Sequence, residues 1–182
     1  DALKGVDLIF GCVDNDGARA VLNELALAYH IPFFDLAVGI DAKDGHIDGA
    51  GGRLAVVVPG GPCLYCMNQI DVEEARYWLS NDEQREFMRR RGYVIGMDIK
   101  APSVVALNAA LAAAATNEFA IYVSGARPVQ PLSELDLLGA GRSVKGQWLT
   151  PVRVSRKPGC PPCEHAGIGD QADIERRYRR EE

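Results

Sequence analysis

Two C-x-x-C pairs constrain the fold of this chain more than any other feature of its sequence. The first is Cys63–Cys66 and the second is Cys160–Cys163, whereas a fifth cysteine, Cys12, stands alone. A C-x-x-C turn can point two thiolates at one metal ion, and two such turns complete the tetrahedron that zinc prefers in structural sites. The pairs therefore predict a structural zinc site with Cys63, Cys66, Cys160 and Cys163 as its ligands. Because these cysteines fill all four positions, no open position is left for a catalytic zinc.

The separation of the two pairs along the chain is the second constraint. Between Cys66 and Cys160 lie 93 residues, whereas a compact zinc ribbon separates its pairs by about 15 to 20. A whole supersecondary unit must therefore lie between them, and the metal would hold a domain together. Two alternatives are buried disulfides, which a reducing cytoplasm disfavours, and a redox centre, which needs only one pair.

Length and charge narrow the class of protein. The 182 residues, 47% of them hydrophobic, predict one domain over residues 1–170 followed by a charged tail over 171–182. The net charge of -5 gives no electrostatic reason to expect nucleic acid or an anionic membrane as a partner. No apolar run approaches the roughly 18 residues of a membrane span, and the first residues show no secretory signal. We therefore expect a cytoplasmic protein, if these are its natural first residues.

Hydrophobic patterns predict an α/β fold. The apolar run 6–13 is typical of a buried strand, the polar residues 14–17 are good helix caps, and residues 18–29 have helical spacing. A second apolar run over 33–38 completes a strand-helix-strand unit, so the sheet should be at least partly parallel. Later patterns predict a turn-rich segment over 41–52, a strand over 53–58, a peripheral amphipathic helix over 71–91, a largely buried helix over 103–119 and a strand over 147–154.

Four motifs follow one another in a specific order. An apolar strand ends in Asp14 and Asn15, with Arg19 and Asn23 at the spacing D-N-x-x-x-R-x-x-x-N. A second apolar strand precedes Gly39, the letters GPCLYC occupy positions 61–66, and GCPPC occupies 159–163. In this order and spacing they resemble the ThiF/MoeB/HesA-type adenylating enzymes, relatives of the ubiquitin-activating enzymes. The resemblance covers nearly all of the chain.

The resemblance implies one particular part of that family's fold. The expected structure is the second half of a Rossmann-like ThiF-type fold, an α/β arrangement with a mixed parallel and antiparallel sheet, helices and a four-cysteine zinc knuckle. The family's first half should hold a glycine-rich phosphate loop after a strand, and this sequence has no such loop. The letters GIGDQA at 167–172 fit a dinucleotide loop, but they follow the second cysteine pair and not a strand. We therefore interpret the chain as a fragment of a longer protein.

The resemblance also implies a reaction. In the family, the C-terminal carboxylate of a ubiquitin-like or sulfur-carrier protein attacks the α-phosphorus of Mg-ATP, giving an acyl-adenylate and pyrophosphate. Asp14 is the catalytic residue that this half would supply, as a ligand of Mg²⁺ at the carboxyl end of a strand. Asn15 and Arg19 would be further nucleotide-binding residues. The alternatives are that Asp14 only caps the following helix and that Arg19 is a surface side chain.

Two more expectations complete the hypothesis. Cys12 lies in an apolar run and should be a buried core residue rather than a nucleophile, so we do not expect a thioester step. The resemblance implies a homodimer. The leading hypothesis is thus the zinc-binding half of an ATP-dependent adenylyltransferase, inactive alone because the glycine-rich loop is absent. The alternative is a non-catalytic zinc-stapled scaffold that binds a partner or dimerises.

Overall fold

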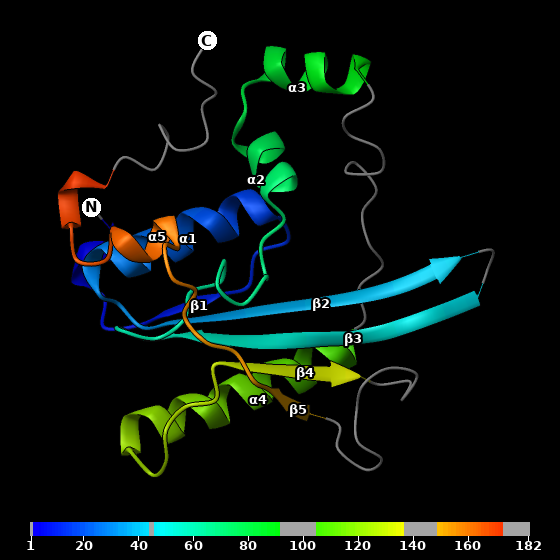
Figure 1. Cartoon of the computed structure of the whole chain (residues 1–182). Coiled ribbons are helices and arrows are strands. Elements are labelled where there is room, and N and C mark those ends of the chain that lie inside the picture. Colours follow the sequence, from blue (N-terminus) through cyan, green and yellow to red (C-terminus); the bar gives the residue numbers. More distant parts are fainter. Residues whose placement is uncertain (1, 44–45, 92–104, 137–148, 173–182) are drawn as a thin grey trace.

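A mixed β-sheet with helices on both faces organises the chain (Figure 1). The computed structural model describes residues 2–43, 46–91, 105–136 and 149–172. The strands are β1 (Ile9–Gly11), β2 (Phe33–Lys43), β3 (His46–Val57), β4 (Leu132–Asp136) and β5 (Leu149–Val152). The helices are α1 (Asp16–Tyr29), α2 (Val72–Leu79), α3 (Asp82–Arg90), α4 (Val105–Ser124) and α5 (Pro161–Glu164), with short 3-10 helices η1 (Ala2–Gly5) and η2 (Gly169–Gln171).

The strands follow one another across the sheet in the order β1-β2-β3-β4-β5. β1 pairs with β2 in parallel, as the strand-helix-strand unit requires, and every later pair is antiparallel. The expected mixed sheet is therefore confirmed. Within the described residues, no helix is both long and apolar enough to cross a membrane.

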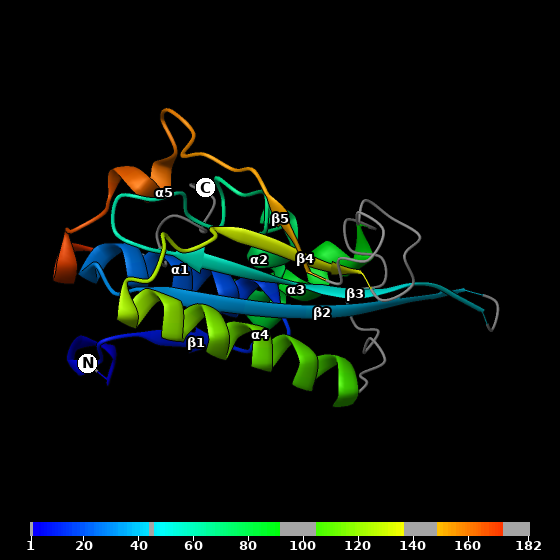
Figure 2. The same ribbon diagram turned by 90° about the horizontal axis from the view of Figure 1, so that it is seen from below.

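Alternating side chains of β2 and β3 divide the core into two layers. Phe33 and Val57 point to the face covered by α1, whereas Phe34 and Val56 point to the face covered by α4. Figures 1 and 2 show α1 and α4 on opposite sides of the sheet. The four cysteines belong to the layer that contains α1. The candidate metal site is therefore an extension of the α1 side of the core.

The segment 41–52 was predicted to be turn-rich, but its described residues, 41–43 and 46–52, belong to the paired strands β2 and β3. The pairing runs from Phe33 opposite Val57 to Lys43 opposite His46, with one register shift between Asp41 and Ala42. The prediction was wrong because the glycines of this segment were interpreted as turn residues. Gly51 and Gly52 allow close approach of neighbouring backbones within the sheet.

Gly51 and Gly39 lie directly opposite each other and provide a matched pair of substitutions. A Cβ at Gly51 would lie 2.2 Å from the carbonyl oxygen of Leu135, whereas a Cβ at Gly39 would meet nothing within 4 Å. Gly51→Ala should cost roughly 1–3 kcal/mol because β4 must move away. Gly39→Ala should be neutral or stabilise the fold by at most about 1 kcal/mol. Equal unfolding midpoints of the two variants in urea would contradict this account.

The helix predicted over 71–91 is two helices. Ser80 has an extended backbone, and Asn81 begins α3 with a capping box in which its side chain accepts from the Gln84 N–H at 2.9 Å. Asp71 caps α2, its side chain accepting from the backbone N–H groups of Glu73 and Glu74. These caps supply separate start signals that the hydrophobic spacing concealed.

The helix predicted over 103–119 begins, within the described residues, at Val105 and continues to Ser124. It is not largely buried as expected, since Val105 is 82% exposed and Val123 is 67% exposed. Only the side that carries Leu107 and Leu111 meets the sheet.

Strand β4 was missed, and the strand predicted over 147–154 is confirmed at residues 149–152. Residues 103–104, 147–148 and 173–182 lie outside the described residues.

Candidate functional site

The four cysteines of the two C-x-x-C pairs converge on one point. Cys63 and Cys66 lie in the loop after β3, Cys160 precedes α5, and Cys163 lies within α5; all four are buried. Their sulfur atoms all lie within 4.8 Å of one another. Cys63 Sγ is 3.8 Å from Cys66 Sγ and 3.6 Å from Cys160 Sγ, and Cys66 Sγ is 3.6 Å from Cys163 Sγ.

These distances fit a tetrahedral metal. A zinc ion bound by four thiolates at about 2.3 Å places the sulfur atoms about 3.8 Å apart along each edge of the tetrahedron. Four buried sulfurs without oxygen or nitrogen ligands favour a soft ion such as zinc. The structure thus brings together all four predicted ligands, and the expected pairing across the intervening 93 residues occurs.

The protonation of the thiols depends on their surroundings. Burial raises the pKa of Cys63 above its usual range and raises that of Cys163 to about 11. Burial also acts on Cys66, but the Lys157 backbone N–H donates to its sulfur at 3.3 Å, and the pKa of Cys66 falls to about 7. Metal binding must therefore release protons from Cys63 and Cys163, and metal uptake should weaken as the pH falls.

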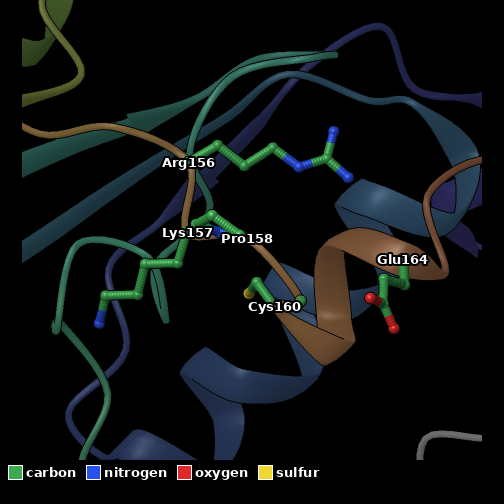
Figure 3. Close-up of a pocket in the computed structure, with 6 residues that line it drawn as sticks. Arg156, Lys157, Pro158, Cys160 and Glu164 are labelled. Atoms are coloured by element: carbon green, nitrogen blue, oxygen red, sulfur yellow. The ribbon is translucent and has the colours of Figure 1, made fainter.

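A hollow of about 290 Å³ lies against the second cysteine pair, and its lining residues are Arg156, Lys157, Pro158, Gly159, Cys160 and Glu164 (Figure 3). Arg156 Nη2 donates to the Cys163 carbonyl at 3.0 Å. Lys157 Nζ donates to the Tyr65 carbonyl at 3.2 Å. Figure 3 shows these two side chains leaving the segment in different directions. Both cations therefore brace the two cysteine turns.

Asp14 lies just beyond the carboxyl end of β1 and is exposed. The N-cap of α1 is not Asp14 but Asn15, whose side-chain oxygen accepts from the Ala18 N–H at 2.8 Å. The Asn15 amide nitrogen in turn donates to Asp14 Oδ1 at 3.1 Å. The alternative in which Asp14 only caps the helix is therefore wrong, because Asn15 performs that function.

Arg19 is buried, so the alternative of a surface side chain is also wrong. Its Nε donates to both carboxylate oxygens of Asp35, at 3.0 and 3.1 Å, and Nη1 forms an ion pair with Asp16. Burial lowers the pKa of Arg19, but Asp35 and Asp16 outweigh this effect and raise it above its ordinary value. Asp35 is fully buried and also pairs with Arg53 at 2.5 Å. Sequence reasoning missed both Asp35 and Arg53.

Asn23 completes a row of side chains on α1 at intervals of four residues. It is fully buried, and its side-chain oxygen accepts from the Leu64 N–H at 3.0 Å. The D-N-x-x-x-R-x-x-x-N spacing thus places three polar groups on successive turns of one helix face. Asn15 caps the helix, Arg19 binds Asp35, and Asn23 holds the first cysteine turn against α1.

Cys12 is exposed, which corrects the expectation that it is a buried core residue. β1 ends at Gly11, so Cys12 lies past the strand, at the edge of the sheet that also carries Asp14. The apolar run 6–13 is longer than the strand Ile9–Gly11, so the run did not show where the strand ends.

Comparison with known proteins then relates this geometry to a fold. No protein-family model matches the sequence, and no curated protein matches it. A crystal structure of E. coli MccB with MccA-N7isoASN aligns with 86% of this chain at 13% identity and a TM-score of 0.54. A crystal structure of E. coli MccB with ATP aligns with 86% at 14% identity and a TM-score of 0.51. The chain has the fold of part of MccB.

MccB is a ThiF/MoeB-type adenylating enzyme, so the fold implied by the four motifs is confirmed. The aligned region spans 40% and 39% of the two MccB chains, well under two thirds of their length. The described part of this chain contributes the five-stranded sheet and its helices to this fold, and it also holds the four-cysteine cluster.

Glu74 of α2 contacts Asp16 at the start of α1 and allows a pH-dependent prediction. Its Oε1 accepts from the Asp16 N–H at 3.4 Å, and burial together with the Asp16 charge raises the pKa of Glu74. A carboxyl whose pKa is raised by folding stabilises the fold when protonated, and that contribution is lost as the pH rises through the folded pKa. Glu74→Gln should therefore raise the melting temperature at pH 7, and the gain should vanish near pH 4.

The control is Glu73→Gln, which alters an exposed neighbour whose carboxylate pairs with Arg76. This change should leave the melting temperature nearly constant, because exposed ion pairs contribute little. A lower melting temperature for Glu74→Gln at pH 7 than for the unaltered chain would refute the sign of the effect.

Proposed function

We propose that this chain is the zinc-binding half of an ATP-dependent adenylyltransferase. The enzyme would activate the C-terminal carboxylate of a ubiquitin-like protein, a sulfur-carrier protein or a peptide. The observation that carries the proposal is the exposed Asp14 at the carboxyl end of β1, where ligands bind in open α/β sheets, in a fold shared with MccB. MccB itself was crystallised with ATP and with MccA-N7isoASN.

In the proposed reaction, a carboxylate oxygen forms a bond to the α-phosphorus of ATP, and the bond from that phosphorus to the pyrophosphate oxygen breaks. Asp14 would hold Mg²⁺, which neutralises the charge that builds on the phosphate oxygens. Asn15 orients Asp14 through its 3.1 Å hydrogen bond. Arg19 donates to the Val13 carbonyl at 2.9 Å and so holds the backbone from which Asp14 projects.

The cysteine cluster has a different function in this proposal. Its four sulfurs would fill the tetrahedron around a zinc ion, so that zinc would be structural and would supply no position for a substrate. The four-cysteine cluster lies in the α1 layer of the core and would hold the loop after β3 to the segment after β5. The enzyme would therefore use zinc for stability and Mg²⁺ for chemistry.

The phosphate-binding loop of such an enzyme would come from residues beyond these 182. The dinucleotide-like letters at 167–172 include the 3-10 helix η2 after α5 and follow no strand. Glycine-rich loops bind phosphate when they connect a strand to a helix N-terminus. On this basis the chain alone should bind Mg-ATP weakly.

Isothermal titration with Mg-ATP tests this proposal. The 182-residue chain should show no micromolar affinity, whereas the natural gene product that contains it should bind Mg-ATP. Micromolar binding of Mg-ATP by the 182-residue chain would contradict the proposal that the phosphate-binding loop comes from other residues. A gene product that does not bind Mg-ATP would instead favour the non-catalytic scaffold.

A further inference from the structure

A buried cluster of charges lies between the Asp14 loop, defined here as residues 13–16, and the first cysteine turn. Its centre is Asp35 on β2, whose side chain has no exposed surface. Arg19 of α1 and Arg53 of β3 both bind this carboxylate, and their side chains are 7% and 14% exposed. A buried carboxylate with two guanidinium partners is held in one geometry, because any displacement leaves a buried charge without its hydrogen bonds.

One side of the cluster holds the Asp14 loop. Arg19 Nη2 donates to the Val13 carbonyl at 2.9 Å, and Arg19 Nη1 contacts Asp16 Oδ1. The carbonyl before Asp14 and the side chain two residues after it are thus attached to the same guanidinium. Asp35 binds the third nitrogen of that guanidinium, accepting from Arg19 Nε at 3.0 Å.

The other side of the cluster holds the cysteine turn. Arg53 Nη2 donates to the Gln69 carbonyl at 3.1 Å, while Nη1 donates to Asp35 Oδ2 at 2.5 Å. The Gln69 N–H donates to the carbonyl of Leu64, which lies between the two cysteines of the turn, at 2.9 Å. A continuous series of hydrogen bonds therefore runs from the turn through Arg53, Asp35 and Arg19.

We propose that Asp35 is a positioning residue that fixes the Asp14 loop relative to the metal-binding cysteine turn. The proposal rests on the proposed function only in assigning Asp14 to the magnesium site. Asp35 pairs with Arg19 and Arg53, and it acts by holding these two side chains in their orientations. The two sites are coupled reciprocally, so loosening the cluster should affect both the loop and the release of zinc.

The test is hydrogen exchange on the zinc-loaded chain carrying Asp35→Asn, with zinc content measured on the same sample. Peptides covering residues 12–18 should exchange about tenfold faster than in the unaltered chain. Transfer of zinc to a chromophoric chelator should also be faster, by about tenfold. Peptides from the Leu107 to Ala115 part of α4 should keep their protection.

Glu118→Gln is the matched control, because Glu118 is also a buried carboxylate that binds an arginine, Arg127, at 2.7 Å. It lies on α4, on the opposite face of the sheet. This variant should leave residues 12–18 and zinc release unchanged. If Glu118→Gln had the same effects as Asp35→Asn, both would report general destabilisation and the proposal would be wrong.

Arg53→Lys provides a second variant if Asp35→Asn does not fold. Lysine keeps the charge beside Asp35, but its single nitrogen cannot span Asp35 and the Gln69 carbonyl as the two guanidinium nitrogens of Arg53 do. Hydrogen exchange at residues 12–18 and zinc release should therefore change in the same direction as in Asp35→Asn. Unchanged exchange at residues 12–18 in either folded variant would overturn the proposal. The measurement involves no nucleotide, so its failure leaves the adenylation hypothesis standing, and a failed Mg-ATP titration leaves this inference standing.

Discussion

Replacing Cys63 with serine should abolish stoichiometric zinc binding and lower the melting temperature by at least about 10 °C. Structural zinc contributes roughly 10–16 kcal/mol in zinc-finger peptides, which is comparable with the whole stability of about 5–15 kcal/mol of a typical domain. A loss of even about 4 kcal/mol produces a shift of that size in a chain of this length. Cys63 is fully buried in the α1 layer of the core, so serine would also bury a hydroxyl among apolar side chains there.

Metal analysis and thermal unfolding measure this prediction, and Cys12→Ser is the control. Cys12 is exposed and lies outside the four-cysteine cluster, so Cys12→Ser should retain about one zinc per chain and the original melting temperature. A chain purified without metal that melts at the same temperature as the zinc-loaded chain would contradict a structural metal.

Replacing Asp14 with asparagine should lower the rate of ATP-pyrophosphate exchange by the natural gene product by about 10² to 10³-fold. Losing one preorganised group that stabilises transition-state charge has an effect of that order. The fold should not change, because Asn15 and not Asp14 caps α1. Hydrogen exchange of α1 and zinc content should therefore match those of the unaltered protein.

Asp7→Asn is the matched control for this substitution. Asp7 is exposed like Asp14, but it precedes β1 and so lies at the opposite end of the strand. Asp7→Asn should leave the rate of ATP-pyrophosphate exchange within about twofold of the original rate, because a surface charge far from the reacting atoms has little effect on them. Equal rates for Asp14→Asn and the unaltered protein would remove Asp14 from the magnesium site.

Local spacing made part of this structure predictable. Two C-x-x-C pairs can satisfy one tetrahedral ion, so the convergence of the four cysteines followed from the sequence even though 93 residues separate the pairs. The parallel β1-β2 pair followed from the strand-helix-strand pattern. The cap of α1 was located only approximately, because Asp14, Asn15 and Asp16 are all good caps and only the backbone distinguishes them.

Long-range features could not be predicted in the same way. A single aspartate within the apolar run 33–38 was a signal for a buried charge, but Arg19 and Arg53 come from different elements and only the folded register joins them to Asp35. The long β2-β3 hairpin was missed because its glycines were interpreted as turn residues. Gly51 instead allows the backbone of β4 to approach closely, and this tertiary contact is not visible in the sequence. Composition could not show that one side of α4 faces solvent, since that depends on which side meets the sheet.

The most direct test is whether the natural gene product exchanges labelled pyrophosphate into ATP in the presence of synthetic peptides with free C-terminal carboxylates. An adenylating enzyme should exchange label with these peptides and Mg²⁺, and it should not do so when the same peptides are amidated. Exchange that is equal with amidated peptides, or ATP consumption that yields ADP and phosphate, would contradict the account.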